Sequence, residues 1–94
     1  MSEPPVVATL YSAAGCHLCL EMRAQLDALA EELPLRLEVI DIAGDAELEA
    51  RYRQELPVLL LNGRKAAKHR ISDAALRDRV ERALGRRRPW WRLR

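Results

Sequence analysis

The chain has 94 residues, of which 49% are hydrophobic and 32% are charged, a composition typical of a single folded domain rather than of a disordered segment. No apolar run approaches the roughly 20 residues of a membrane span, and the first residues lack the basic segment and apolar run of a signal peptide. We therefore expect a cytoplasmic protein with no membrane span, whose thiols are normally kept reduced.

The net charge of +2 conceals an uneven distribution of charged residues. Residues 86–94 contain five of the sixteen basic residues, both tryptophans and no acid, so the rest of the chain carries a net charge of −3. We divide the chain into one domain over residues 1–85 and a basic Arg/Trp tail over 86–94. Such a tail can attract nucleic acid or an anionic membrane, or its tryptophans can fold back onto the domain. We expect no specific nucleic-acid partner.

The first half of the chain predicts a strand, a helix and a second strand. Residues 6–11 are β-branched and apolar, as in a buried strand. From Cys16 onward apolar residues follow helical spacing until Pro34 ends the helix, and residues 35–41 alternate as a strand does. A helix between two apolar strands predicts parallel pairing with a right-handed crossover.

The second half predicts a helix, two strands and a last helix. The helix over 45–56 has Asp45 as its N-cap, and the strand over 57–61 begins with a proline. Asn62-Gly63 predicts a type I′ hairpin leading into a strand over 64–68. The last helix spans 72–84, with these residues expected to face inward: Ala75, Leu76, Val80, Ala83 and Leu84.

The two cysteines of the chain, Cys16 and Cys19, stand two residues apart where the first strand gives way to the first helix. At a strand-to-helix turn this spacing is typical of a redox motif. A ring this small removes little entropy from the unfolded chain and is a poor structural staple. The unpaired N–H groups of a helix start also stabilise a thiolate. The alternative of two inert buried cysteines remains.

Metal binding is a second interpretation of the same pair. Structural zinc requires four ligands, and beyond the two thiols the chain offers only His17 and His69. Because His69 follows the fourth strand, we expect it to lie far from the start of the first helix, which disfavours a closed site within one chain. An iron–sulfur cluster that Cys16 and Cys19 hold between two subunits remains open.

The element order β-α-β-α-β-β-α, with a CxxC pair after the first strand and a proline opening the third, resembles the thioredoxin fold and, within it, the glutaredoxin-like family. The resemblance covers about residues 6–85. It implies an α/β, thioredoxin-like fold with a four-stranded mixed sheet flanked by three helices. It also implies thiol–disulfide oxidoreductase activity on protein disulfides or glutathione mixed disulfides. We expect no bound cofactor, with glutathione as reductant or substrate, and a monomer.

We expect Cys16, Cys19 and His17 to carry the chemistry. Cys16 would be the nucleophile, and Cys19, one helical turn on, would displace the substrate from it. His17 lies inside the ring, where an imidazole can favour the thiolate or can simply be an exposed surface histidine. Glutaredoxins commonly place Pro-Tyr between their cysteines, where this chain has His17-Leu18.

The resemblance also implies a substrate-binding set: Leu18, Leu56, Pro57, Ser72 and Asp73. In the thioredoxin fold the proline matching Pro57 is cis, so that the preceding residue, here Leu56, presents its backbone to an extended substrate. A polar pair like Ser72-Asp73 binds the γ-glutamyl end of glutathione in glutaredoxins, although plain N-capping needs the same residues.

Two positions depart from the glutaredoxin pattern. His69-Arg70-Ile71 replaces the usual Gly-Gly before the last helix, and Ala13 stands where a basic residue often precedes the first cysteine. Replacement charge could come from Arg53, Arg70 or Arg77, although each can equally be a solvated surface arginine. A third interpretation of the chain is a noncatalytic adaptor that docks through its tail.

Overall fold

The computed structural model describes residues 5–85, so the predicted tail over 86–94 lies outside the described part. The order of elements matches the prediction. In chain order they are β1 (Val6–Ser12), α1 (His17–Ala30), β2 (Leu35–Asp41), α2 (Ala46–Tyr52), β3 (Val58–Leu61), β4 (Arg64–Lys68) and α3 (Asp73–Ala83). No helix among residues 5–85 is long and apolar enough to cross a membrane.

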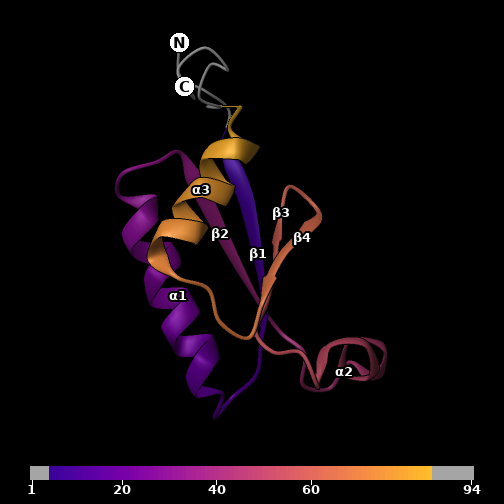
Figure 1. The fold of residues 1–94 in the computed structure, drawn as a ribbon. Coiled ribbons are helices and arrows are strands. Elements are labelled where there is room, and N and C mark those ends of the chain that lie inside the picture. The colour runs from indigo at the N-terminus through magenta and orange to yellow at the C-terminus, as the bar shows by residue number, and fades with distance from the viewer. Residues whose placement is uncertain (1–4, 86–94) are drawn as a thin grey trace.

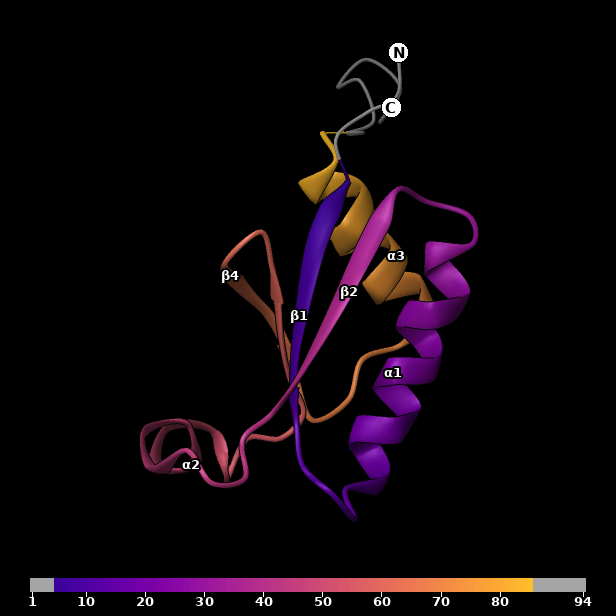
Figure 2. The ribbon, with the colours of Figure 1, turned by 180° about the vertical axis from the view of Figure 1, so that it is seen from behind.

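The four strands form one mixed sheet in the order β2-β1-β3-β4. β1 pairs with β2 in parallel, as predicted for two strands joined by a helix, whereas β3 pairs antiparallel with both β1 and β4. β2 is an edge strand. Both α1 and α3 cover one face of this sheet, and α2 lies beyond the end of the sheet at which β1 and β2 finish (Figures 1 and 2).

The core lies between the sheet and the pair α1 and α3. Strand residues that alternate along β1 and β3 meet the apolar stripes of the two helices there, as amphipathic elements require. The buried cluster consists of Val6, Ala8, Leu10, Met22, Leu26, Leu29, Leu33, Leu59, Leu61, Leu76 and Val80.

The hairpin between β3 and β4 has the geometry that Asn62-Gly63 predicts. Both residues have positive φ, 51° at Asn62 and 82° at Gly63, which is the requirement of a type I′ turn. The Asn62 side chain also accepts a hydrogen bond from the backbone N–H of Val7 at 2.9 Å, which ties the turn to β1. A β-bulge between Leu59 and Leu60 shifts the register with β4.

Three details of the helices differ from the prediction. α1 ends at Ala30, with residues 31–33 forming turns rather than continuing the helix to Pro34. α2 spans Ala46–Tyr52 and does not reach Leu56, because the residue before a proline is disfavoured in the helical region. Ala83, expected to face inward, is exposed, since Leu84 takes the position over the core at the end of α3.

Candidate active site

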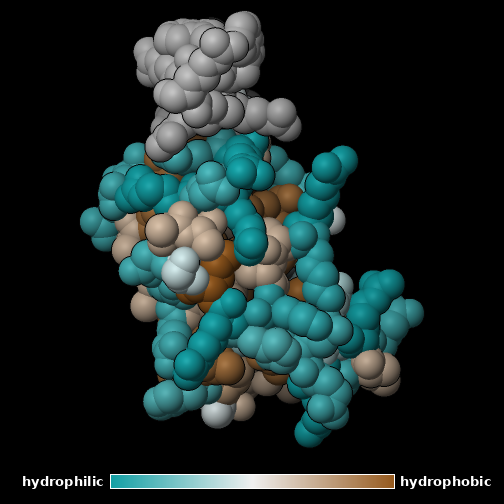
Figure 3. Space-filling model, viewed as in Figure 1, coloured by the Kyte–Doolittle hydropathy of each residue, from teal (hydrophilic) through white to brown (hydrophobic). Residues whose placement is uncertain are grey.

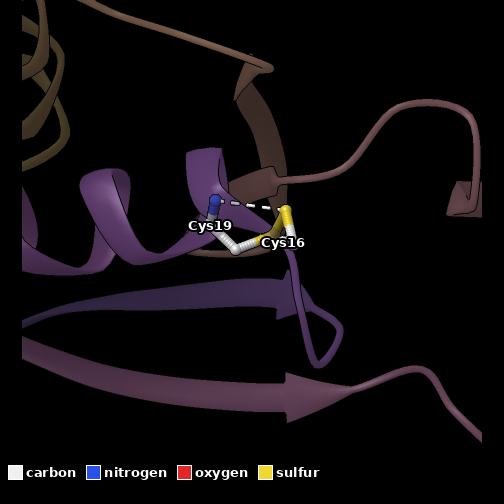
Figure 4. The surroundings of a disulfide bond; sticks show 2 residues. All are labelled: Cys16 and Cys19. Atoms are coloured by element: carbon white, nitrogen blue, oxygen red, sulfur yellow. Dashed lines mark hydrogen bonds between the residues drawn. A yellow bond between two sulfur atoms is a disulfide. The ribbon is translucent and has the colours of Figure 1, made fainter.

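Cys16 and Cys19 form a disulfide at the start of α1, with Cα atoms 5.2 Å apart. Cys16 is the N-cap of the helix, and its Sγ accepts a hydrogen bond from the backbone N–H of Cys19 at 3.2 Å (Figure 4). Cys16 is half-buried, whereas only 3% of Cys19 is exposed. Cys16 is therefore the more accessible of the two cysteines.

The loop between β1 and α1 places Cys16 at the end of a turn. Cys16 donates its backbone N–H to the carbonyl of Ala13 at 3.3 Å, which closes a turn with Gly15 at φ +78°. That conformation strains any residue with a Cβ, although open space surrounds the position where a Cβ would lie. The first turn of α1 contains no acidic residue, so no carboxylate there opposes a negative charge on Cys16.

Two hollows flank the disulfide, and they share the loop residues 13–16. The first, the Leu56 hollow, has a volume of about 520 Å³. Its lining consists of Ala13, Ala14, Gly15, Cys16, Ile42, Ala43, Glu49, Arg53 and Leu56. The second, the Leu20 hollow, has a volume of about 530 Å³. It is lined by Leu10, Ser12, Ala13, Ala14, Gly15, Cys16, Cys19, Leu20, Arg23, Val39 and Asp41.

The Leu56–Pro57 peptide bond is cis, as the resemblance implies, and Leu56 lines the same hollow as Cys16. The carbonyl of Pro57 accepts a hydrogen bond from the backbone N–H of His69 at 3.0 Å. The backbone N–H and C=O of Leu56 have no hydrogen-bond partner within residues 5–85. Both hydrogen-bonding groups of this peptide segment are therefore left for a ligand.

Glu55 ties this segment to β4. Its carboxylate accepts a hydrogen bond from Lys65 Nζ at 2.5 Å and lies 3.9 Å from Lys68 Nζ. The hydrogen bond from Lys65, with the charges of Lys65, Lys68 and His69, holds the pKa of the Glu55 carboxyl below its ordinary value of 4.5 against the opposing effect of desolvation. This exposed ion pair thereby holds Glu55, the residue before Leu56, to β4.

His17 and Leu18, the two residues inside the CxxC ring, take different positions. His17 is exposed at the first position of α1. Leu18 is half-buried and lines a third hollow, whose lining also includes His69, Arg70 and Ile71. His69 therefore shares a hollow with Leu18, the second residue of α1.

No group of three or more His, Cys, Asp or Glu side chains that could hold a metal ion occurs among residues 5–85.

Ser72 and Asp73 make contacts within the protein. Ser72 is the N-cap of α3, and its Oγ accepts a hydrogen bond from the backbone N–H of Ala75 at 3.1 Å. Asp73 Oδ1 accepts one from Gln25 Nε2 at 2.7 Å, and the same nitrogen donates to the carbonyl of Ile71 at 2.8 Å. Neither residue lines a hollow that contains Cys16.

The three arginines named from the sequence lie in three different places. Arg53 lines the Leu56 hollow and forms an ion pair with Glu49 at 2.7 Å. Arg70 lines the Leu18 hollow. Arg77 pairs with Glu32 at 2.6 Å, and this hydrogen bond raises the pKa of the guanidinium. Only Arg53 shares a hollow with Cys16.

Sequence reasoning found the two cysteines of the Leu20 hollow but missed its exposed apolar residues, Leu20 and Val39. Leu20 was recognisable, because it is a large apolar residue that falls outside the helical stripe of Met22, Leu26 and Leu29 and follows the second cysteine directly. The exposure of Val39 was not recognisable, since the alternating pattern of the strand predicts burial at its position.

Comparisons with known proteins agree with this geometry. The family model described as a glutaredoxin-like domain (DUF836) matches residues 7–81. The uncharacterized protein Rv0508 of Mycobacterium tuberculosis (strain H37Rv) is 33% identical over 88 residues, covering 88% of this chain and 89% of its own length. The uncharacterized protein Mb0520 of Mycobacterium bovis matches with the same identity and coverage.

Solved structures share the fold. Protein Ne2328 from Nitrosomonas europaea superposes with a TM-score of 0.72 and 28% identity, over 85% of this chain and 96% of that one. A mutant thioredoxin from Halobacterium salinarum superposes with a TM-score of 0.65, over 88% of this chain and 78% of that one, and at 24% identity it shows the fold alone. The chain belongs to the glutaredoxin-like domain family and has the thioredoxin fold.

Proposed function

We propose that this protein is a thiol–disulfide oxidoreductase that reduces disulfides of proteins or mixed disulfides of glutathione. A redox role is supported by the family and by the Cys16–Cys19 disulfide in a thioredoxin fold. The observation that carries the proposal is the difference in accessibility between the two sulfurs. Cys16 opens onto two hollows, and Cys19 is buried within bonding distance behind it.

The reaction begins with the reduced dithiol form. The Cys16 thiolate attacks one sulfur of a substrate disulfide, and the other substrate sulfur leaves as a thiolate that takes up a proton. Cys19, deprotonated in turn, attacks Cys16 and displaces the remaining substrate thiol. Two electrons pass from the protein to the substrate, and the protein ends as the disulfide seen in the structure. A thiol reductant such as glutathione then restores the dithiol.

The surroundings of Cys16 supply the groups that this reaction needs. The helix N-terminus and the Cys19 N–H stabilise negative charge on the attacking sulfur. The unused backbone groups of Leu56 can pair with an extended substrate across the Leu56 hollow. Arg53 lines the same hollow and supports binding of a carboxylate there, provided that it exchanges its Glu49 partner.

Two cysteine variants test the proposal. Turnover of a glutathione mixed disulfide should be lost in Cys16→Ser. Cys19→Ser should still react once and accumulate a stable protein–substrate mixed disulfide detectable by its mass. Undiminished turnover in Cys16→Ser would exclude the proposed role. Absence of the mixed disulfide from Cys19→Ser, with circular dichroism unchanged, would contradict the assignment of Cys16 as the nucleophile.

A further inference from the structure

Two large apolar side chains are exposed in the described part of the chain, and both lie beside the disulfide. Leu20 is 66% exposed and Val39 is 38% exposed. They come from α1 and from β2, yet both line the Leu20 hollow together with the two cysteines. The face seen in Figure 3 is largely hydrophilic, and hydrophobic side chains reach its surface only in small, separate areas. An apolar patch next to a reactive sulfur is a typical feature of a binding site rather than of a folding requirement.

The positions of these two residues follow from the fold. Leu20 follows Cys19 and falls off the stripe that packs into the core. Val39 pairs with the buried Leu10 across the sheet, so it lies on the face covered by α1. It is nevertheless exposed, because β2 is an edge strand. The fold therefore places two uncovered apolar side chains on the side of the disulfide opposite Leu56.

The rim of the Leu20 hollow carries one cation with no partner of opposite charge. Arg23 forms no ion pair within residues 5–85. Asp41 lies on the same hollow, and its Oδ1 accepts a hydrogen bond from the backbone N–H of Ala43 at 2.8 Å, so the rim carries one negative and one positive side chain. Of these two, Arg23 is the one whose side chain is not engaged within the described residues, and a guanidinium is complementary to an acidic group on a ligand.

Building on the proposed function, we propose that the Leu20 hollow binds a polypeptide substrate next to its disulfide. The occupant is an extended segment with an apolar side chain beside the cysteine that Cys16 attacks, and with an acidic residue that pairs with Arg23. Glutathione carries no apolar side chain, so it gains little from Leu20 and Val39. A polypeptide can cross the disulfide and fill the hollows on both sides, since they share the loop at 13–16.

The substrate step follows the same electron balance as the proposed reaction. A mixed disulfide between a peptide cysteine and glutathione offers Cys16 two sulfurs. Attack on the peptide sulfur forms a Cys16–peptide bond and releases glutathione, which takes up a proton. Attack on the other sulfur forms a Cys16–glutathione bond and releases the peptide thiol. The patch should favour the first route, because it holds the peptide sulfur beside Cys16.

The experiment measures which sulfur is attacked. The Cys19→Ser protein keeps the adduct, so mass spectrometry can quantify the peptide and glutathione adducts from one reaction. One synthetic heptapeptide–glutathione disulfide has Leu and Asp flanking the cysteine, and its match has Ser and Lys. We expect the ratio of peptide to glutathione adduct to be about fivefold higher for the Leu/Asp peptide, because partial burial of a leucine recovers part of its transfer free energy.

Variants of the hollow identify the cause of that preference. Leu20→Ser with Val39→Ser, made in the Cys19→Ser protein, should reduce the preference for the Leu/Asp peptide. Arg23→Glu should lower the adduct ratio of the Leu/Asp peptide and raise that of the Ser/Lys peptide. Arg64→Glu, the same charge change at an exposed residue of the β3–β4 hairpin, should leave the adduct ratios unchanged.

The outcomes separate the two proposals. Equal adduct ratios for both peptides, or a preference that survives in all of the hollow variants, would overturn the binding role of the Leu20 hollow and leave the redox function in place. Absence of any adduct, under conditions in which free cysteine reacts, would instead refute the proposed function itself. Because Leu20, Val39 and Arg23 are exposed, the variants should remain folded, and circular dichroism checks this.

Discussion

The sulfur of Cys16 accepts a hydrogen bond from the backbone N–H of Cys19, three residues on in the same helix, over 3.2 Å. This is the bond that an N-cap side chain makes to the first turn of a helix, with sulfur in place of the usual oxygen. The cap and the proposed nucleophile are therefore one residue. Ionisation of the thiol strengthens the cap, because a thiolate accepts the hydrogen bond better than a thiol and also faces the positive end of the helix.

The pH dependence of alkylation tests this coupling. We expect the pKa of the Cys16 thiol in the reduced protein to lie below the ordinary value of about 8.5. Iodoacetamide labelling of the Cys19→Ser protein, followed by mass across a range of pH from acid to alkaline, measures it. Labelling that titrates at the ordinary value would contradict a stabilised thiolate. His17→Ala separates the contribution of the exposed imidazole from that of the helix start.

Gly15→Ala should destabilise the protein and displace Cys16. A residue with a Cβ at φ +78° costs about 1–2 kcal/mol. No atom lies within 4 Å of the added Cβ, so the cost is one of backbone conformation and not of a clash. Urea unfolding measures the loss, and alkylation kinetics report any movement of the sulfur. Gly85→Ala, at φ +82° beyond α3, is the matched control that should lower stability without changing alkylation.

Ser72 offers a test between capping and substrate binding. Ser72→Ala removes the bond to the Ala75 N–H and should cost about 1 kcal/mol in the free energy of unfolding. If the serine only caps α3, the KM for a glutathione mixed disulfide stays unchanged. Ser72→Asp retains a capping oxygen and should keep the stability. A raised KM in Ser72→Ala with stability intact would assign the residue to binding.

The Glu55 ion pair predicts a pH dependence of stability. The folded pKa of this carboxyl lies below 4.5, so its contribution is present above the unfolded pKa and is lost as pH falls through the folded pKa. Wild type should exceed Glu55→Gln in urea midpoint at neutral pH, and the difference should disappear once the pH lies below the folded pKa. Because the pair is exposed, high salt should also reduce the difference. A difference that persists in acid would contradict this prediction.

An aromatic contact joins α2 to the sheet. Tyr52 stacks on Tyr11 of β1 with ring centroids 4.5 Å apart, while α2 has no buried residue. Tyr52→Ala should therefore increase hydrogen exchange at residues 46–52 and leave exchange in α1 unchanged. The stacking itself contributes about 0.5–1.5 kcal/mol beyond the buried area. Unchanged exchange in α2 would show that other contacts hold the helix.

Much of the fold could be predicted from local pattern. The apolar stripe of α1, the alternation along β1 and the Asn62-Gly63 turn each determine a local geometry, and the seven elements follow in their predicted order. The cis conformation of the Leu56–Pro57 peptide bond was also predicted, from the resemblance to the thioredoxin fold and not from composition. Helix ends were less well predicted, since the turns at 31–33 and 53–55 depend on how the chain enters the next strand.

What the sequence alone determined is the redox pair and the scaffold that carries it. Hydrophobic periodicity and the two-residue spacing of Cys16 and Cys19 are local properties of the sequence. Short-range sterics and hydrogen bonds are therefore enough to determine the elements that these patterns form. Only the tertiary structure decided what surrounds that pair. It joined His69 to Pro57 through a backbone hydrogen bond, placed Asp73 within hydrogen-bond distance of Gln25, and exposed Leu20 and Val39 on one hollow. These neighbours come from elements far apart in the chain, and no local pattern encodes the packing that joins them.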